Sequence, residues 1–373
     1  MRVLVVSVVH TPLDARIHHR QIRALTDNDF EVTQVAPWRA TATPDEDGVD
    51  AVRRIDVPRA VGRRRLRALR AARRIIARFG PAHDLILLHD PELLLAVTGR
   101  LRRLPPVVLD VHEDLAAALV DRAWLPAPLR LAAAFTVRRA ERFAEDHLAA
   151  LLLAEEGYRD RFRAEHLLVP NLPWLPAESP AAVDTGRVVH VGRLSVGRGA
   201  RELIAVAEEL TRTGGPMLHL VGPADGDVTK ALQAAHDRGA LTWHGFMSND
   251  AAMDLLQGAV AGLALLHDLP NYRVSLPTKI GEYLAHGVPP IVTPLPQAVH
   301  MVEGSGCGVV VPFGDVPGTV EAIRELAADP QRRRRWGELG RAYIAEGHSW
   351  NAVAPRFVAH LRELAARGAA GRA

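Results

Sequence analysis

Two loops in the second half of the chain carry charged residues that could bind a diphosphate. In the first loop, Arg193 and Arg198 follow the apolar run Val188–Val191 and precede a helical stretch that begins near Ala200. A strand end that leads into a helix presents backbone amides, and cations beside them stabilise phosphate oxygens. Both arginines could therefore point at one phosphate. The alternative is a turn with two solvated arginines.

The second loop leads into a short helix with a cation and a carboxylate one turn apart. Pro277 suits the first turn of this helix and Gly287 suits its C-terminal cap. Thr278 and Glu282 are four residues apart and so share one face. A phosphate at the amino end and a ribose one turn further along would match that spacing, and Lys279 adds a cation at the same end. The alternative is a capped amphipathic helix with an exposed Glu–Lys pair.

Titratable residues crowd the end of the apolar run Val107–Val111 in the first half. Asp110, His112, Glu113 and Asp114 lie in or directly after this expected buried strand, where charge is costly unless it has a purpose. We therefore treat His112 as a candidate at the reacting centre. Glu113 is an alternative candidate, as a general base that would activate a second substrate, the acceptor. The competing interpretation of His112 is a structural role.

Further polar residues follow two other expected strands of the first half. His89, Asp90 and Glu92 come after Leu88, and Asp14 and Arg16 come after the first strand. Ligands of open α/β domains bind at the carboxyl ends of the strands. These five residues are therefore candidates to line the cleft that would bind the second substrate, the acceptor.

The elements that must position these residues are short apolar runs alternating with longer helical stretches. Continuous apolar strands between helices are typical of parallel sheets covered on both faces, so the fold class is α/β. The runs expected to form strands are Val3–Val9, Leu85–Leu88, Val107–Val111, Leu148–Leu153, Val188–Val191, Leu218–Val221, Val260–Leu266, Val288–Val292 and Val309–Val311.

A proline-rich stretch interrupts this pattern near residues 170–187 and predicts a domain boundary. We expect an N-terminal domain over 1–172, a linker over 173–186 and a C-terminal domain over 187–348. The remaining residues, 349–373, include a helical stretch that we expect to pack back on the first domain.

The composition suits a two-domain globular protein. The chain has 373 residues, and its formal net charge of +3 is too small for one built mainly to bind nucleic acid. The single cysteine, Cys307, allows no disulfide within the chain and fits a cytoplasmic location. The first apolar run, Val3–Val9, is too short for a signal peptide core, and no stretch is long enough to span a membrane.

One segment, Arg63–Arg78, predicts an amphipathic helix with a strongly basic face. In an arginine-rich chain the first interpretation is a solvated helix face. The second is peripheral contact with an anionic membrane surface or an acidic acceptor.

Two other motifs are rejected as metal or cofactor sites. Asp225–Asp227 forms an Asp-Gly-Asp sequence that we interpret as a polar turn. The pair His112 and Glu113 is not a zinc motif, because Ala116 stands where the second histidine would be.

Taken together, the motifs resemble the GT-B glycosyltransferases, and in particular family 4, also called group 1. The resemblance runs over nearly the whole chain. It rests on Asp14–Ile17, His89–Leu93, Asp110–Glu113, Val169–Asn171, Val191–Leu194, His244–Phe246, Pro277–Lys279 with Glu282–Tyr283, and Gly306–Gly308.

The resemblance implies a role for most of the candidate residues. Arg193 and Arg198 match the basic pair that neutralises the donor diphosphate, and Glu282 matches the glutamate that binds the ribose. Gly192, Pro277, Thr278 and Lys279 fall in the donor-binding motifs, and His112 matches a histidine near the donor sugar. One departure is Val274, which stands where the family usually has a second glutamate. The other is Thr11–Asp14, which replaces the common glycine pair.

For the whole chain the resemblance implies two Rossmann-like domains that face each other across a cleft. The implied reaction is transfer of a sugar from a UDP- or GDP-sugar to a small-molecule, glycan or glycolipid acceptor, with retained anomeric configuration and without a metal or cofactor. The implied location is the cytoplasm or the inner face of the membrane. Two alternatives are an epimerase or hydrolase on the same scaffold and a non-catalytic nucleotide-sugar-binding subunit.

Overall fold

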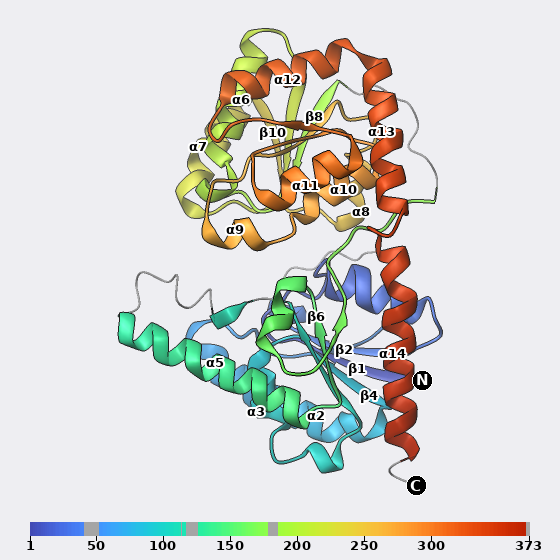
Figure 1. Ribbon diagram of the computed structural model, residues 1–373. Coiled ribbons are helices and arrows are strands. Elements are labelled where there is room, and N and C mark those ends of the chain that lie inside the picture. The colour runs from blue at the N-terminus through green and yellow to red at the C-terminus, as the bar shows by residue number, and fades with distance from the viewer. Residues whose placement is uncertain (41–51, 113, 117–125, 178–185, 371–373) are drawn as a thin grey trace. The chain divides into compact units, whose positions relative to one another are not determined.

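The computed structural model describes residues 1–40, 52–112, 114–116, 126–177 and 186–370 (Figure 1). The chain divides into two compact units. The first comprises Met1–Asn171 together with Val353–Ala373, and the second comprises Leu172–Ala352. In the described residues no helix is both long and apolar enough to cross a membrane.

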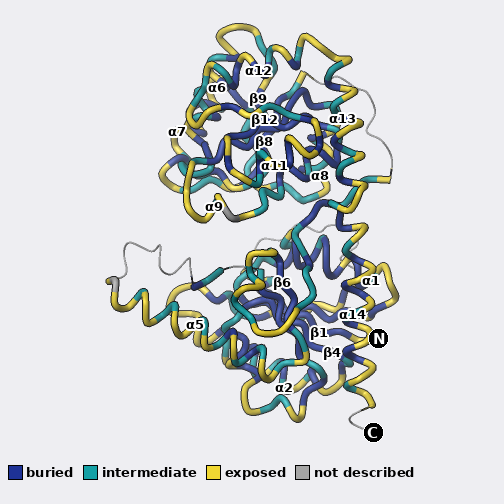
Figure 2. The backbone as a smooth tube through the Cα atoms, in the orientation of Figure 1, coloured by how far each residue is buried: buried dark blue, intermediate teal, exposed yellow. Residues whose placement is uncertain are grey.

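The first unit contains a seven-stranded parallel sheet in the order β3-β2-β1-β4-β5-β6-β7. Its central strands are buried (Figure 2), and the carboxyl ends of β1, β4 and β5 meet at one edge of the sheet. The strands are β1 Arg2–Val6, β2 Glu31–Ala36, β3 Val52–Asp56, β4 Leu85–Leu88, β5 Val107–Val111, β6 Ala150–Leu153 and β7 Leu167–Leu168.

Helices pack on this sheet and include the basic segment singled out in the sequence. In α2 the buried residues are Ala68, Ala72 and Ile76, which pack in the core of the unit, while most of the arginines are exposed. The apolar stripe of α2 is therefore used inside its own unit. The main helices are a π-helical turn at Ile17–Ile22, α1 Arg23–Thr26, α2 Arg65–Phe79, α3 Leu94–Val97, α5 Ala127–His147 and α14 Trp350–Ala370.

The second unit contains a six-stranded parallel sheet in the order β10-β9-β8-β11-β12-β13. Strand β8 lies in the middle, so the loop that follows it is central to the edge where ligands of such sheets bind. The strands are β8 Arg187–Val191, β9 Met217–Val221, β10 Leu241–Gly245, β11 Ala261–Ala264, β12 Pro290–Val292 and β13 Val309–Val310.

Helices also cover this sheet, and separate apolar clusters form between it and them. Together the two parallel sheets confirm the predicted α/β fold of two Rossmann-like units. The helices are α6 Ala200–Arg212, α7 Gly226–Asp237, α8 Asn249–Asp254, α9 Pro270–Val274, α10 Thr278–Ala285, α11 Pro296–Ser305, α12 Val316–Ala328 and α13 Pro330–Ala345, with a 3-10 turn η9 at Val196–Arg198.

Residues 173–186, predicted from the sequence to be a linker, start inside the second unit. Its prolines lack the N–H group that a strand ladder needs, but their carbonyl oxygens accept hydrogen bonds. Pro173 O accepts from the Trp350 amide at 2.7 Å, and Pro176 O accepts from the Arg341 guanidinium at 3.0 Å. These bonds attach residues 173–176 to the second unit.

Candidate functional site

Two glycines shape the loops that follow β8 and β9 in the second unit. Gly192 and Gly222 have φ values of +127° and +132°, which side-chain-bearing residues rarely adopt. The two loops lie against each other, since the Leu194 amide donates to Pro223 O at 2.9 Å. A Cβ atom on Gly222 would lie 2.1 Å from the Gly192 carbonyl oxygen. The loop after β8 therefore keeps its shape only with glycine at these positions.

Lys279, on the first turn of α10, lies buried beneath this loop. Its Nζ is 3.3 Å from His190 Nε2, and a Cβ on Gly192 would lie 3.5 Å from that same Nζ. Burial, together with the positive charge of Arg198, lowers the pKa of Lys279 to about 7. The alternative of an exposed Glu–Lys pair on this helix is thus wrong for the lysine.

His190, in the middle of the sheet, holds the Lys279 amine through a fixed tautomer. Burial, and then the charge of Lys279, lowers the pKa of His190 well below its ordinary value, so the ring is neutral. Its Nδ1 donates to the Leu263 carbonyl at 3.0 Å. The Nε2 therefore carries a lone pair, which accepts a hydrogen bond from Lys279.

Arg198 is the second cation at this edge of the sheet. It lies on η9, directly before α6, with its guanidinium 5.8 Å from the centre of the Tyr272 ring. Within the described part of the chain, neither Arg198 nor Lys279 forms an ion pair with a carboxylate. No side-chain hydrogen bond caps α10 at its amino end. Two cations without a counter-ion beside an uncapped helix start form a site for an anion.

The other donor-side candidates lie near this site in different ways. Arg193 is largely exposed and pairs with Asp225 at 2.5 Å, so it does not share the burial of Lys279. Thr278 and Glu282 lie on α10 and are partly buried. Pro277 takes the N-cap position of α10, one residue before the first turn where the sequence analysis expected it, because its ψ of 89° lies outside the helical range.

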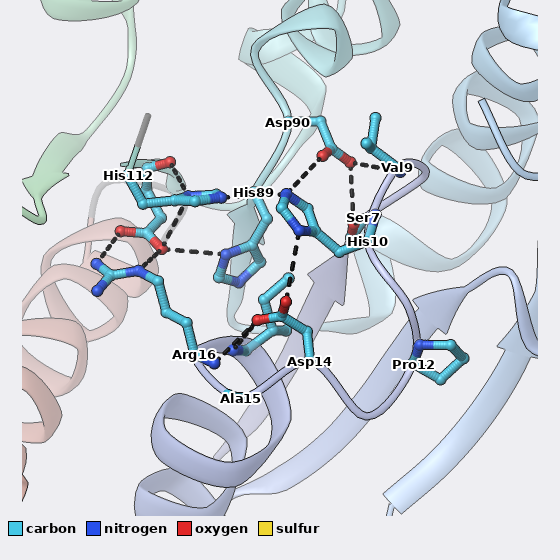
Figure 3. Close-up of polar contacts among 12 residues, drawn as sticks. Ser7, Val9, His10, Pro12, Asp14, Ala15, Arg16, His89, Asp90 and His112 are labelled. Carbon is cyan, nitrogen blue, oxygen red and sulfur yellow. Dashed lines mark hydrogen bonds and ion pairs between the residues drawn. The ribbon is translucent and has the colours of Figure 1, made fainter. Parts of the chain in front are cut away.

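In the first unit, the buried carboxylate of Asp110 at the end of β5 accepts hydrogen bonds from three segments of the chain. Figure 3 shows two of the side chains around it, Arg16 and His89. Arg16 binds it with two bonds, from Nε at 2.8 Å and from Nη2 at 2.6 Å. Gln21 Nε2 donates to the same carboxylate at 2.9 Å, and His89 Nδ1 lies 3.1 Å from it. Burial alone would raise the pKa of Asp110, but the charge and hydrogen bonds of Arg16, with hydrogen bonds from His112 and His89, outweigh it and hold the pKa well below the ordinary value.

His10 and His112 meet beside this carboxylate. Their Nε2 atoms are 3.1 Å apart, while His10 Nδ1 lies 3.5 Å from Asp14 and His112 Nδ1 lies 3.2 Å from the Asp110 carbonyl oxygen. His10 Nε2 also lies 3.4 Å from Asp90 Oδ1, and His112 Nδ1 lies 3.5 Å from Asp110 Oδ2. The carboxylates of Asp14, Asp90 and Asp110 therefore surround the two rings.

Asp14 and Asp90 fix the loop that carries His10. Asp14 Oδ1 accepts from the amides of Arg16 and Ile17, and Asp90 Oδ2 accepts from the Val8 amide and the Ser7 hydroxyl. Burial would raise the pKa of Asp14, but its hydrogen bond and charge interaction with His10 lower it strongly. The loop after β1 is thus held by two carboxylates, which position His10.

Some buried polar atoms in this cluster have no hydrogen-bond partner among the described residues. They are Arg16 Nη1, Gln21 Oε1 and His89 Nε2. Burial lowers the pKa of His89 although Asp110 opposes the shift, so this ring is neutral. Donor and acceptor atoms left open in this way suit a ligand with hydroxyl groups.

His89, Asp110 and His112 also lie close enough to be considered as metal ligands, with ligand atoms within 4.8 Å of one another. However, Arg16 occupies both oxygens of Asp110, and Gln21 donates to one of them. A divalent cation would have to displace a buried guanidinium. The donor set therefore fits a hydrogen-bonded network better than a metal centre.

The structure thus brings together Asp14, Arg16, His89, Asp90 and His112 among the candidates of the first unit. Glu92 lies apart, because it pairs with Arg65 on α2. Glu113 lies outside the described residues. His10, Gln21 and Ser7 were not predicted from the sequence. A histidine directly after the first strand and four residues before Asp14 was the available signal for His10.

Part of the sequence is similar to known proteins. Residues 185–329 match the family described as Glycosyl transferases group 1. The chain is 27% identical over 248 residues to an alpha-D-kanosaminyltransferase from Streptomyces kanamyceticus, a match that spans 60% of this chain and 63% of that protein.

Solved structures share the whole fold at low sequence identity. Sucrose-phosphate synthase from Thermosynechococcus elongatus is 18% identical with a TM-score of 0.69, and the match covers 98% of this chain and 99% of that one. The Anabaena protein HepE in complex with UDP-glucose is 14% identical with a TM-score of 0.70, covering 97% of this chain and 100% of that one. The sequence likeness to the Glycosyl transferases group 1 family thus lies in residues 185–329, and the chain as a whole has the GT-B fold.

Proposed function

We propose that this chain transfers a sugar from a UDP- or GDP-sugar to an acceptor hydroxyl. The observation that carries the proposal is the pair of cations, Lys279 and Arg198, without a carboxylate partner in the described residues at the carboxyl end of β8. A diphosphate is the leaving group whose charge such a site would stabilise. The relative from Streptomyces kanamyceticus is named as a sugar transferase, and HepE was solved with UDP-glucose, which supports the proposal.

In the proposed reaction, the bond between the anomeric carbon and the diphosphate oxygen breaks, and a bond from the acceptor oxygen to the same carbon forms. Arg198, Lys279 and the amino end of α10 stabilise the charge on the departing diphosphate. Glu282, one turn further along α10, accepts hydrogen bonds from the ribose hydroxyls. Arg193 adds a solvent-exposed cation near the phosphates.

The first unit is proposed to bind the acceptor and the donor sugar. His112 orients the sugar, while Asp14, Arg16, His89 and Asp90 line the acceptor side. We propose retention of configuration, with the acceptor attacking on the face from which the diphosphate leaves. The reaction as proposed has no metal step. A role for Glu113, a cytoplasmic location and membrane contact through Arg63–Arg78 stay predictions.

The first test is thermal stabilisation of the full chain by UDP, GDP, ADP and the corresponding nucleotide sugars, in the presence of a chelator. A ligand that binds only the folded state raises the melting temperature. We expect a shift for one nucleobase that Glu282→Ala removes. No shift with any nucleotide at saturating concentration would contradict the proposal.

The second test uses the nucleotide sugar that binds. Arg198→Ala should lower kcat/KM about 10²- to 10³-fold, the usual effect of removing one donor to a developing negative charge, with the melting temperature unchanged. Arg201→Ala is the matched control, because Arg201 is an exposed arginine three residues along on α6. Sugar released or epimerised from donor alone, with no dependence on an acceptor, would identify a hydrolase or an epimerase instead.

A further inference from the structure

Lysine is nearly absent from this chain, which makes its presence in the anion site informative. Of the 46 lysines and arginines, Lys230 and Lys279 are the two lysines. Lys230 is exposed on α7, whereas Lys279 is buried beside a second cation. Arginine stays protonated in proteins, but lysine releases its proton when it is buried. The anion site therefore contains a cation whose charge can change.

The contacts of Lys279 use only part of its hydrogen-bonding capacity. An ammonium group has three hydrogen-bond donors, and within the described residues Nζ has one partner, His190 Nε2. That partner is neutral and brings no negative charge. The remaining donors of a buried group are left without acceptors, and phosphate oxygens would supply both the acceptors and the charge.

Among the residues that the structure describes, no carboxylate forms an ion pair with Lys279. His190 faces it from β8, and Arg198 acts on it from η9. On α10 itself, the Tyr283 hydroxyl accepts a hydrogen bond from the Val191 amide of β8 and donates one to the Leu263 carbonyl of β11, each at 3.1 Å. From α13, the Arg341 guanidinium reaches the other end of the helix, at Ala285 O. Glu282 also lies on α10, one turn from the amino end.

We propose that Lys279 takes up a proton from solvent when a nucleoside diphosphate binds, so that donor binding and protonation of this side chain are coupled. The inference rests on the proposed function. Before a ligand binds, burial and the charge of Arg198 favour the neutral amine. The bound diphosphate brings negative charge and acceptors, which favour the ammonium form. No covalent bond changes in this step, and release of the diphosphate returns the proton to solvent.

Direct observation of the lysine side chains tests this coupling in the full chain. Protein labelled with ¹³C-lysine gives two Cε signals, which Lys230→Arg assigns. The Lys279 signal of the free protein should titrate with a midpoint near pH 7. Saturating UDP or GDP should hold it at the protonated position up to about pH 9, while the Lys230 signal serves as the internal reference.

Calorimetry at pH 8 measures the proton itself. The terminal phosphate of UDP or GDP, with a pKa of about 6, is already ionised there. Titrations in two buffers with different ionisation enthalpies should show uptake of about one proton per bound ligand. Lys279→Arg should bind without proton uptake, and Glu282→Gln should bind more weakly but keep it. Lys230→Arg is the matched control and should behave as the wild type.

The outcomes separate this inference from the proposed function. Diphosphate binding without proton uptake, or uptake that persists in Lys279→Arg, would overturn the inference and leave the proposed function intact. Failure of UDP, GDP and inorganic pyrophosphate all to bind would overturn both.

Discussion

Burial of the Lys279 amine destabilises the second unit when no ligand is bound. Its pKa of about 7 in the folded chain compares with 10.5 for an ordinary lysine. Between these values the unfolded chain binds more protons than the folded one, so stability rises with pH across this window. Below pH 7 the folded state holds a charged amine in a buried place, which is the least favourable case.

Replacing this amine by an apolar side chain should therefore stabilise the free protein. At pH 6 we expect Lys279→Met to raise the melting temperature of the second unit, by about 2–4 °C for each kcal/mol gained. The same variant should lose its stabilisation by UDP or GDP. Lys230→Met, at an exposed position, is the control and should change neither property. A lower melting temperature with a retained ligand response would contradict the burial argument.

Asp110 makes the opposite contribution in the first unit, because its ionised form neutralises the buried Arg16 guanidinium. Asp110→Asn leaves that guanidinium without a counter-charge, at an expected cost of about 3–5 kcal/mol in the free energy of unfolding. Asp27→Asn is the control, since it removes an exposed ion pair with Arg23 and should cost less than about 1 kcal/mol. Urea denaturation of the three proteins measures the difference.

The pH dependence of this contribution has a defined sign. The folded-state pKa of Asp110 is lowered, so its stabilisation is complete above the ordinary pKa and is lost as pH falls through the folded value. The advantage of the wild type over Asp110→Asn should therefore shrink below about pH 4. An advantage that stays constant down to pH 2 would show that folding does not lower the pKa of Asp110.

At the scale of elements, apolar runs predicted most strands of both sheets but missed β2 and the outer strands β3, β7 and β10. The expected runs correspond to β1, β4, β5, β6, β8, β9, β11, β12 and β13. Strand β2 was missed because Thr33 and Gln34 interrupt its apolar pattern. Both are buried, since Thr33 bonds to His83 and Gln34 bonds to Pro12 O. Buried polar residues that form tertiary hydrogen bonds interrupt the apolar pattern by which a strand is recognised in the sequence.

The candidate sites were predictable to a similar degree. Residues that follow apolar runs, such as Asp90 and His112, could be selected because the ends of parallel strands meet. His10 was missed, since its importance depends on Asp14 and His112, which only the folded chain brings to it. The burial of Lys279 could not be predicted, because it depends on the glycine loop that lies over α10.

That glycine loop supports a prediction at the scale of elements. Gly222→Ala would place a Cβ 2.1 Å from Gly192 O, so the loops after β8 and β9 must separate. We expect loss of nucleotide binding and destabilisation by several kcal/mol, which is in the range of strain at special backbone positions. Gly239→Ala is the control, because Gly239 also has a positive φ of +73° but open space around it. Thermal shift with UDP or GDP compares the variants, and equal binding by both would refute the role of the loop.

At the scale of the whole molecule, the order of the units does not follow the order of the chain. The helix α14 comes after the second unit in sequence, yet from Val353 onward it belongs to the first unit. Its inner face, with Phe357 and Leu361, is fully buried, and Arg362 donates to Asn28 O. The first unit is therefore complete only after the last helix has been synthesised.

A substitution on the buried face of α14 should consequently destabilise the first unit. Phe357→Ala removes a fully buried ring, at an expected cost of about 3–5 kcal/mol. Calorimetry with and without the bound nucleotide distinguishes the transitions, since the ligand raises only that of the second unit. We expect Phe357→Ala to lower the nucleotide-insensitive transition, while the control Arg356→Ala, at an exposed position one residue earlier, changes neither. A selective fall of the nucleotide-sensitive transition would instead assign α14 to the stability of the second unit, because a buried ring stabilises the core in which it packs.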